Sequence, residues 1–322
     1  MKNNSFSEVL RMRDPKVAKT FSEILKFNPY HDSRGRFTSA NGGVASFSAN
    51  PNTKAGKLAI ERRGGLVAAA HGVADAETKT KDKAAISAGI DKVRNSVGNE
   101  AKPLKREAVN VDKIMKEGGC DRATAEKAAA EAKAIYDRVS AAEPQITSDI
   151  VGAVGANNGK MYGLDHRMKS ETSLGRKIAS DAQAEFDGDL KSASANVKDA
   201  VRYTAVFETA DFTQGYKNVK QSLEEKGYTE QRCKNYFADY NEGTSVQKAV
   251  QCVYVDKSGN RLELQFHTYE SQGAKEVNHP LYEQSRAAST SASQKSVLND
   301  RMTSISSNVP DPDGVMTIQR HK

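Results

Sequence analysis

The segment from Val255 to Thr268, VDKSGNRLELQFHT, constrains the fold more than any other stretch of the chain. Its DKSGN part is rich in turn residues, and Gly259 can adopt the positive φ of a tight turn between two strands. In LELQFHT, apolar and polar residues alternate, which places Glu263, Gln265 and His267 on one face of a sheet. The segment therefore predicts a strand whose open face carries a carboxylate, an amide and an imidazole. A half-buried strand with a solvated outer face has the same pattern.

Two further segments alternate in the same way. KMYGLDHRMKS places Arg167 and Lys169 on one side of a strand, and DAVRYTAVFE places Arg202 with Thr204. Helical patterns separate these strands. The chain therefore predicts an α+β fold, a mixed β-sheet of about five strands flanked by helices. If the polar faces of the strands align, cations and carboxylates converge on one site.

Composition divides the chain into four regions. We expect a disordered basic arm or docking segment (1–60), a helical region (61–125), the sheet domain (126–290) and a disordered tail (291–322) that is rich in Ser, Thr, Asn and Gln. The net charge of +7 comes from the N-terminal third, because the rest of the chain holds slightly more acidic than basic residues. This surplus points to an anionic partner, although a solvated arm without a specific partner explains it equally well.

Several classes of protein are disfavoured. The three cysteines have no paired spacing and the six histidines form no HxxxH or HxH motif, so neither a disulfide framework nor a transition-metal site is expected. No run of about 18 apolar residues and no apolar leader are present, so no membrane partner is expected. We expect a cytoplasmic location in a bacterial host, with packaging in a phage particle or export without a signal peptide as alternatives.

The predicted polar face suits a polyphosphate substrate. Arg and Lys neutralise phosphate oxygens, and one or two carboxylates hold Mg²⁺, for which Asp199 and Glu263 are the candidates. The segment SETSLGRK begins a helix at Ser170 whose free N–H groups and hydroxyls suit a phosphate, although an ordinary helix cap has the same sequence. No GxxxxGK[ST] motif occurs, which excludes a P-loop enzyme.

The ordered series RMKSETSLGRK, DAVRYT, KNY and LELQFHT, followed by HPLYEQSR, resembles the synthetase domain of the RelA/SpoT-homologue alarmone synthetases, in particular their compact toxin-like members. The resemblance covers roughly residues 130–290. It implies a nucleotidyltransferase-like fold and a Mg²⁺-dependent transfer of pyrophosphate from ATP to a ribose 3′-hydroxyl of a nucleotide or of tRNA. A toxin of this kind implies a neutralising antitoxin or immunity protein. Separately, NPYHDSRGRFTSA resembles a segment of phage head-associated proteins, which implies a phage or prophage origin.

The resemblance also implies roles for individual residues. Asp199 and Glu263 would hold the metal and activate the acceptor hydroxyl. The ATP-binding residues would be Arg167, Lys169, Ser173, Lys177 and Arg202, and the acceptor would contact Gln265, His267, and Tyr236 or Tyr240. Tyr236 or Tyr240 would replace the family's acceptor-stacking tyrosine, because Gly243 stands at that position. The chain also departs from the family in that Asp199 lies closer to the strand arginine than usual. A structural role is expected for Lys275, His279, Tyr282, Glu283 and Arg286 in the closing helix.

Two other functions fit the sequence less well. One is a virion-associated structural or adaptor protein that keeps an inactive synthetase-like domain. The other is a different nucleotide-using toxin, such as an ADP-ribosyltransferase, which ranks lowest because no ordered series of Arg, Ser-Thr-Ser and Glu-x-Glu is present.

Overall fold

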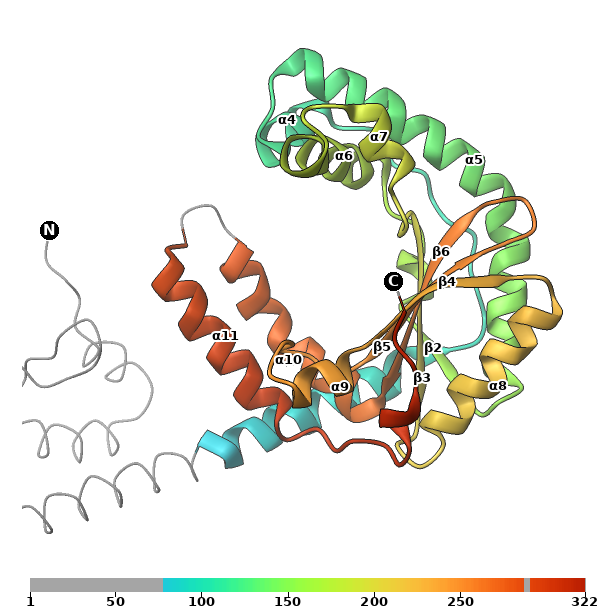
Figure 1. Cartoon of the computed structure of the whole chain (residues 1–322), viewed down its shortest axis with the longest axis vertical. Coiled ribbons are helices and arrows are strands. Elements are labelled where there is room, and N and C mark those ends of the chain that lie inside the picture. Colours follow the sequence, from blue (N-terminus) through green and yellow to red (C-terminus); the bar gives the residue numbers. More distant parts are fainter. Residues whose placement is uncertain (1–77, 287–289, 322) are drawn as a thin grey trace, which may run out of the picture. The chain divides into compact units, whose positions relative to one another are not determined.

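The computed structural model describes residues 78–286 and 290–321. A boundary between two units falls at Thr80/Lys81, and nearly all described residues belong to the second unit. The arm predicted for residues 1–60 lies outside the described residues. The second unit is an α+β fold with one six-stranded mixed sheet flanked by helices (Figure 1), which confirms the predicted fold class.

The sheet runs in the order β1-β2-β3-β6-β5-β4. Strands β3 and β6 are parallel neighbours, and all other neighbouring pairs are antiparallel. The strand bounds are β1 Val97–Gly98, β2 Lys160–Tyr162, β3 Val201–Phe207, β4 Thr229–Asn235, β5 Val250–Val255 and β6 Arg261–Thr268. The two strands predicted to carry polar faces, β3 and β6, therefore lie side by side at the centre of the sheet.

One face of the sheet is apolar and is covered by two helices, α5 (Arg122–Gly155) and α8 (Phe212–Glu225) (Figure 1). Leu262, Leu264 and Phe266 of β6 are fully buried there, as the alternation predicted. The Phe266 ring stacks on Phe207 of β3 and meets Tyr216 of α8 edge-on, with centroids 5.0 Å apart. These aromatic contacts fix the orientation of the sheet, so the polar residues of β3 and β6 face away from α5 and α8.

Helix α5 continues past Pro144 because its apolar stripe extends on both sides of the proline. The Asp121 side chain caps its start by accepting from the Thr124 backbone N–H. The side chains of Ile146 and Ile150, which follow Pro144, are buried and keep the helix packed on the sheet. Three shorter helices pack beside α5 at one end of the fold: α4 Val111–Gly118, α6 Glu171–Glu185 and α7 Leu190–Ala195.

At the other end, α10 (Tyr269–Arg286) packs against a helix that ends at residue 96. Their backbones meet at two glycines, since a Cβ on Gly89 would lie 2.6 Å from the Gly273 carbonyl oxygen. No side chain larger than hydrogen fits this crossing. The short helix α9 (Tyr236–Asn241) follows β4. None of the described helices combines the length and apolarity needed to cross a membrane.

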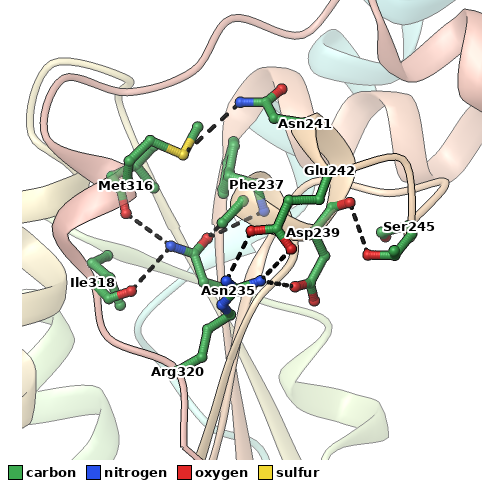
Figure 2. A network of polar contacts seen from close by, with 12 residues as sticks. Asn235, Phe237, Asp239, Asn241, Glu242, Ser245, Met316, Ile318 and Arg320 are labelled. Carbon is green, nitrogen blue, oxygen red and sulfur yellow. Dashed lines mark hydrogen bonds and ion pairs between the residues drawn. The ribbon is translucent and has the colours of Figure 1, made fainter.

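The prediction of a disordered tail at 291–322 is wrong. Ser291 caps helix α11 (Ala292–Ser306) in a capping box, and α11 packs on α10 with Met302 and Ile305 buried. The remaining segment runs back along α9 and β4 (Figure 2), where the Asn235 side chain donates to the carbonyl of Ile318. Polar composition concealed the few apolar residues that are sufficient to order this segment against the sheet domain.

Candidate active site

The face of the sheet opposite α5 and α8 carries two rows of polar side chains. In the first row, Arg202 of β3 is the register partner of Glu263 of β6, and Arg232 of β4 lies in the same row beyond β5. In the second row, the register aligns Thr204, Gln265, Gln251 and Lys234. Parallel pairing in register places the β3 and β6 side chains adjacent on one face. The two central strands therefore bring a guanidinium and a carboxylate together.

Lys169 and Asp199 join this face as an ion pair. Met168 forms an isolated antiparallel bridge with Val201, and this bridge sets the Lys169 ammonium against the Asp199 carboxylate. Both side chains are about one-fifth exposed. Burial opposes ionisation of Asp199, but the ammonium groups of Lys169 and Lys177 outweigh burial and hold the pKa of Asp199 below its usual value. Asp199 is therefore a carboxylate at neutral pH.

One oxygen of Asp199 has no partner. Oδ2 accepts from Lys169, whereas Oδ1 is buried without a hydrogen bond to any described residue. Glu263, which is 4 % exposed, accepts from the Gln265 amide at 2.5 Å through Oε1 and makes no other side-chain hydrogen bond in the described part of the chain. A buried carboxylate oxygen without a donor costs free energy unless a cation meets it. Asp199 and Glu263 thus fit the needs of a hard divalent cation such as Mg²⁺.

Besides Arg232, Lys275 is a site residue that the sequence patterns did not identify. It projects from α10, and its ammonium donates to Gln265 Oε1 at 2.6 Å and lies 3.4 Å from His267 Nε2. A structural role was expected for it. The helical spacing of Ser271, Lys275 and Asn278 was an available signal, because it places Lys275 on the buried side of α10 that faces β6.

The environment of Lys275 shifts its titration. Burial and the nearby Arg202 guanidinium lower the pKa of Lys275 to about 8, with Glu263 opposing the shift. Burial also lowers the pKa of His267, which is 1 % exposed and lies against the Lys275 ammonium, so His267 is neutral. The His267 side chain, expected to line an acceptor, is instead covered by α10.

This shift predicts a pH dependence of stability. The pKa of Lys275 is about 8 in the folded protein against 10.5 for a free lysine, so between these values the unfolded chain binds more protons and stability rises with pH. Below about pH 8 the cost of burying the charge is fully present. We expect the free energy of unfolding of the native chain, relative to Lys275→Met, to increase by about 2 kcal/mol from about pH 7.5 to about pH 10 in urea titrations. If the native chain and Lys275→Met differed in free energy of unfolding by the same amount at both pH values, the lowered pKa of Lys275 would be contradicted.

Arg167 does not join this group, which corrects the expectation from strand alternation. Gly163, at φ 67°, starts a 3-10 turn (η1, Leu164–His166), and Arg167 itself has helical backbone angles, so the period of two does not apply. Its side chain is buried towards α5, with Nε 2.5 Å from Glu143 Oε1. The two terminal nitrogens donate to the carbonyls of Leu164 and Lys102.

Ser173 and Lys177 lie on the first turns of α6, next to the Lys169–Asp199 pair. Ser173 is held by Ser170, which caps the helix. The Lys177 ammonium pairs with Asp181 at 2.8 Å, and the field of Asp199 acts on it. A pocket with a volume of about 280 Å³ opens beside this turn, and its lining includes His166, Lys169, Ser170 and Ser173. The two predicted α6 residues therefore border the polar face without reaching its centre.

The two candidate acceptor tyrosines have different surroundings. Burial raises the pKa of Tyr236. The Arg232 guanidinium opposes this shift and the Glu263 carboxylate reinforces it, so Tyr236 lies within the field of the first row. Tyr240 donates to the carbonyl of Thr303 at 2.9 Å. The Lys248 ammonium lies over its ring, 4.7 Å from the ring centroid. Tyr236 belongs to the site, whereas Tyr240 anchors α11.

The polar face carries an excess of positive charge. Among the described residues, neither Arg202 nor Arg232 forms a side-chain hydrogen bond or ion pair, and Nε of Arg232 is buried without an acceptor. Burial lowers the pKa of Lys198. The positive charges of nearby Arg232, Arg261 and Lys234 lower it further. Uncompensated cations that repel one another are stabilised by a polyanion. The face can therefore bind a polyphosphate through guanidinium and ammonium groups and a divalent cation through its carboxylates.

Comparisons with known proteins give a structural similarity but no sequence match. No protein-family model matches the chain, and no curated protein matches its sequence. A chain in the crystal structure of the complex between the Type VI effector Tas1 and its immunity protein aligns with this one at a TM-score of 0.36 and 14 % identity, over 54 % of this chain and 93 % of that chain. A similarity at this level assigns neither a fold nor a function.

Proposed function

We propose that the chain is a Mg²⁺-dependent pyrophosphokinase that transfers pyrophosphate from ATP to the ribose 3′-hydroxyl of a nucleotide or of tRNA, and that it acts as a toxin. The observation that carries the proposal is the convergence of Lys169, Asp199, Arg202 and Glu263 on one face of the sheet. Burial lowers the pKa of Lys169, and Asp199, Arg202 and Glu263 all act on its ammonium, so the four groups share one electrostatic environment. The motifs that resemble alarmone synthetases supply these same residues.

The chemistry assigns a task to each group. The acceptor 3′-oxygen bonds to the β-phosphorus of ATP, the bond from that phosphorus to the α,β-bridging oxygen breaks, and AMP leaves. Arg202 and Arg232, whose guanidinium groups meet no acceptor among residues 78–286 and 290–321, would neutralise the phosphate oxygens, where charge develops as the bond breaks. Asp199 and Glu263 would hold Mg²⁺, which when bound offsets phosphate charge. Lys169 holds Asp199 ionised, and Glu263 takes the proton of the acceptor hydroxyl.

Position-specific labelling tests this reaction. The purified full-length chain is incubated with Mg²⁺, a panel of guanine and adenine nucleotides or tRNA, and ATP labelled in either the γ- or the α-phosphate. The expected result is γ-label on the acceptor and α-label in AMP. The absence of γ-label from every acceptor would overturn the proposal. Transfer of label from NAD to protein would instead favour an ADP-ribosyltransferase. If expression arrests cell growth and an inactive variant does not, the toxin role holds.

A further inference from the structure

The apolar face of the sheet contains a group of polar residues that the proposed reaction does not use. Cys233 of β4 and Cys252 of β5 are direct register partners, both are buried, and their sulfur atoms lie 3.6 Å apart. The backbone N–H and C=O of Cys233 bond to His321 on the other side of β4. The cysteine pair therefore occupies a position without ladder hydrogen bonds between the strands, where facing side chains approach most closely.

Two more ligand-type side chains join the cysteines. A register irregularity between Glu230 and Arg232 turns the Glu230 carboxylate towards the sulfurs, and one ligand atom from each of the three residues lies within 4.8 Å of the other two. The C-terminal segment adds an imidazole, with His321 Nε2 3.6 Å from Glu230 Oε1. Arg320 fixes that segment by pairing with Asp239 and Glu242 of the α9 region (Figure 2).

We propose that Glu230, Cys233 and Cys252 bind a zinc ion, with His321 as the fourth ligand. A tetrahedral ion at about 2.3 Å from each sulfur requires the two sulfurs to be about 3.8 Å apart, close to the observed 3.6 Å. Two thiolates select a borderline-soft ion over Mg²⁺ or Ca²⁺, and tetrahedral geometry favours Zn²⁺. The imidazole needs only a side-chain rotation to complete the shell, because His321 is 42 % exposed.

The charges around the cluster balance when the ion is present. Zinc binds cysteines as thiolates, so its binding displaces the thiol protons of Cys233 and Cys252. Two thiolates and one carboxylate then carry one negative charge more than the ion neutralises. The Lys220 ammonium, 2.8 Å from Glu230 Oε1, offsets that charge. The hydroxyls of Tyr216 and Tyr254 donate to Glu230 Oε2 and orient the carboxylate from outside the shell.

The site has a structural consequence. Its ligands come from two neighbouring strands and from the C-terminal segment, so the ion would clamp that segment to β4, which lies at one end of the strand order. The spacing of Cys and His along the chain gave no sign of a metal site, because the sheet, rather than a local loop, assembles the ligands. The zinc cluster and the candidate active site lie on opposite faces of the sheet and do not share side chains.

Metal content and cobalt spectroscopy test the proposal. The full-length chain, purified without chelators and with reductant, should contain one zinc per chain, and Co²⁺ in its place should give a thiolate-to-metal charge-transfer band together with the intense visible bands of tetrahedral cobalt. Cys252→Ser should reduce zinc content at least tenfold. Cys120→Ser is the matched control, because Cys120 lies outside the cluster, and it should keep one zinc per chain.

The wild-type chain decides the matter even if Cys252→Ser does not fold. Failure of the native protein to retain zinc after addition of one equivalent, or the absence of the charge-transfer band, would overturn the proposal. A Cys233–Cys252 disulfide in the reduced preparation would overturn it as well. His321→Ala removes only the exposed ligand and should weaken zinc binding about tenfold or more while leaving the cobalt charge-transfer band in place.

Discussion

Asp199→Asn should reduce pyrophosphate transfer on the order of a thousandfold. The substitution keeps the size of the side chain but removes the charge that the Lys169–Asp199 pair and the proposed cation require. Oδ1 of Asp199 is buried and has no hydrogen-bond partner in the described part of the chain, which is the strongest sign that this carboxylate serves something other than its ion pair. Single-turnover transfer of γ-label at saturating Mg²⁺ measures the effect on the chemical step rather than on product release.

A carboxylate of similar burial on another part of the fold gives the matched control. Asp149 of α5 is 12 % exposed and pairs at 2.8 Å with Lys226, which lies at the C-terminal end of α8. Asp149→Asn should leave transfer within about twofold of the native rate while perturbing a comparable ion pair. If Asp199→Asn retained more than a tenth of the native rate, the assignment of Asp199 to the reaction would be wrong. Thermal unfolding of both variants shows whether a loss of rate reflects a loss of fold.

Combining Asp199→Asn with Glu263→Gln distinguishes a shared metal site from two independent contributions. Residues that hold one ion act as a unit, so the double variant should be about as slow as the slower single variant. Independent contributions would multiply instead.

Alternation in the sequence was sufficient to predict the central strands. Leu262, Leu264 and Phe266 are buried as predicted, and the β3 and β6 polar residues lie on one face in register. Period-two patterns succeed where the backbone is extended over several residues and one face meets a packed layer. They failed for Arg167, because the turn after Gly163 breaks the extended backbone just before it. Helical spacing places Lys275 on the buried side of its helix, but a single sequence does not show that this side meets β6.

Tertiary contacts that are distant in sequence explain the remaining differences. The tail after residue 290 is ordered because α11 packs on α10, where the Asn278 side chain donates to Ser306 Oγ at 3.1 Å. His267 lies on the predicted face, but α10 covers it. In both cases the local pattern was compatible with exposure, and packing against a helix elsewhere in the chain decided the outcome.

Glu143→Ala should lower the free energy of unfolding by about 3–5 kcal/mol, because it leaves the Arg167 guanidinium buried without its carboxylate. Arg167 is 4 % exposed and Glu143 is 7 % exposed. Thr147 connects the pair to the sheet, since it hydrogen bonds to Glu143 and lies 2.7 Å from the Tyr203 hydroxyl. Urea unfolding followed by far-UV circular dichroism measures the change. A loss below about 1 kcal/mol would show that water or another group reaches Arg167.

An exposed glutamate–arginine pair on the same helix is the control for this prediction. Glu126 and Arg122 are 3.9 Å apart and both more than half exposed, so Glu126→Ala should change the free energy of unfolding by about 0.5 kcal/mol or less. Replacing Glu143 and Arg167 together by Met should recover much of the stability lost in Glu143→Ala, because two apolar side chains leave no buried charge. If that double variant were stable but unable to bind ATP, Arg167 would contact the substrate after all. Retention of ATP binding would establish that its guanidinium supports the segment that presents Lys169 and takes no part in the site itself.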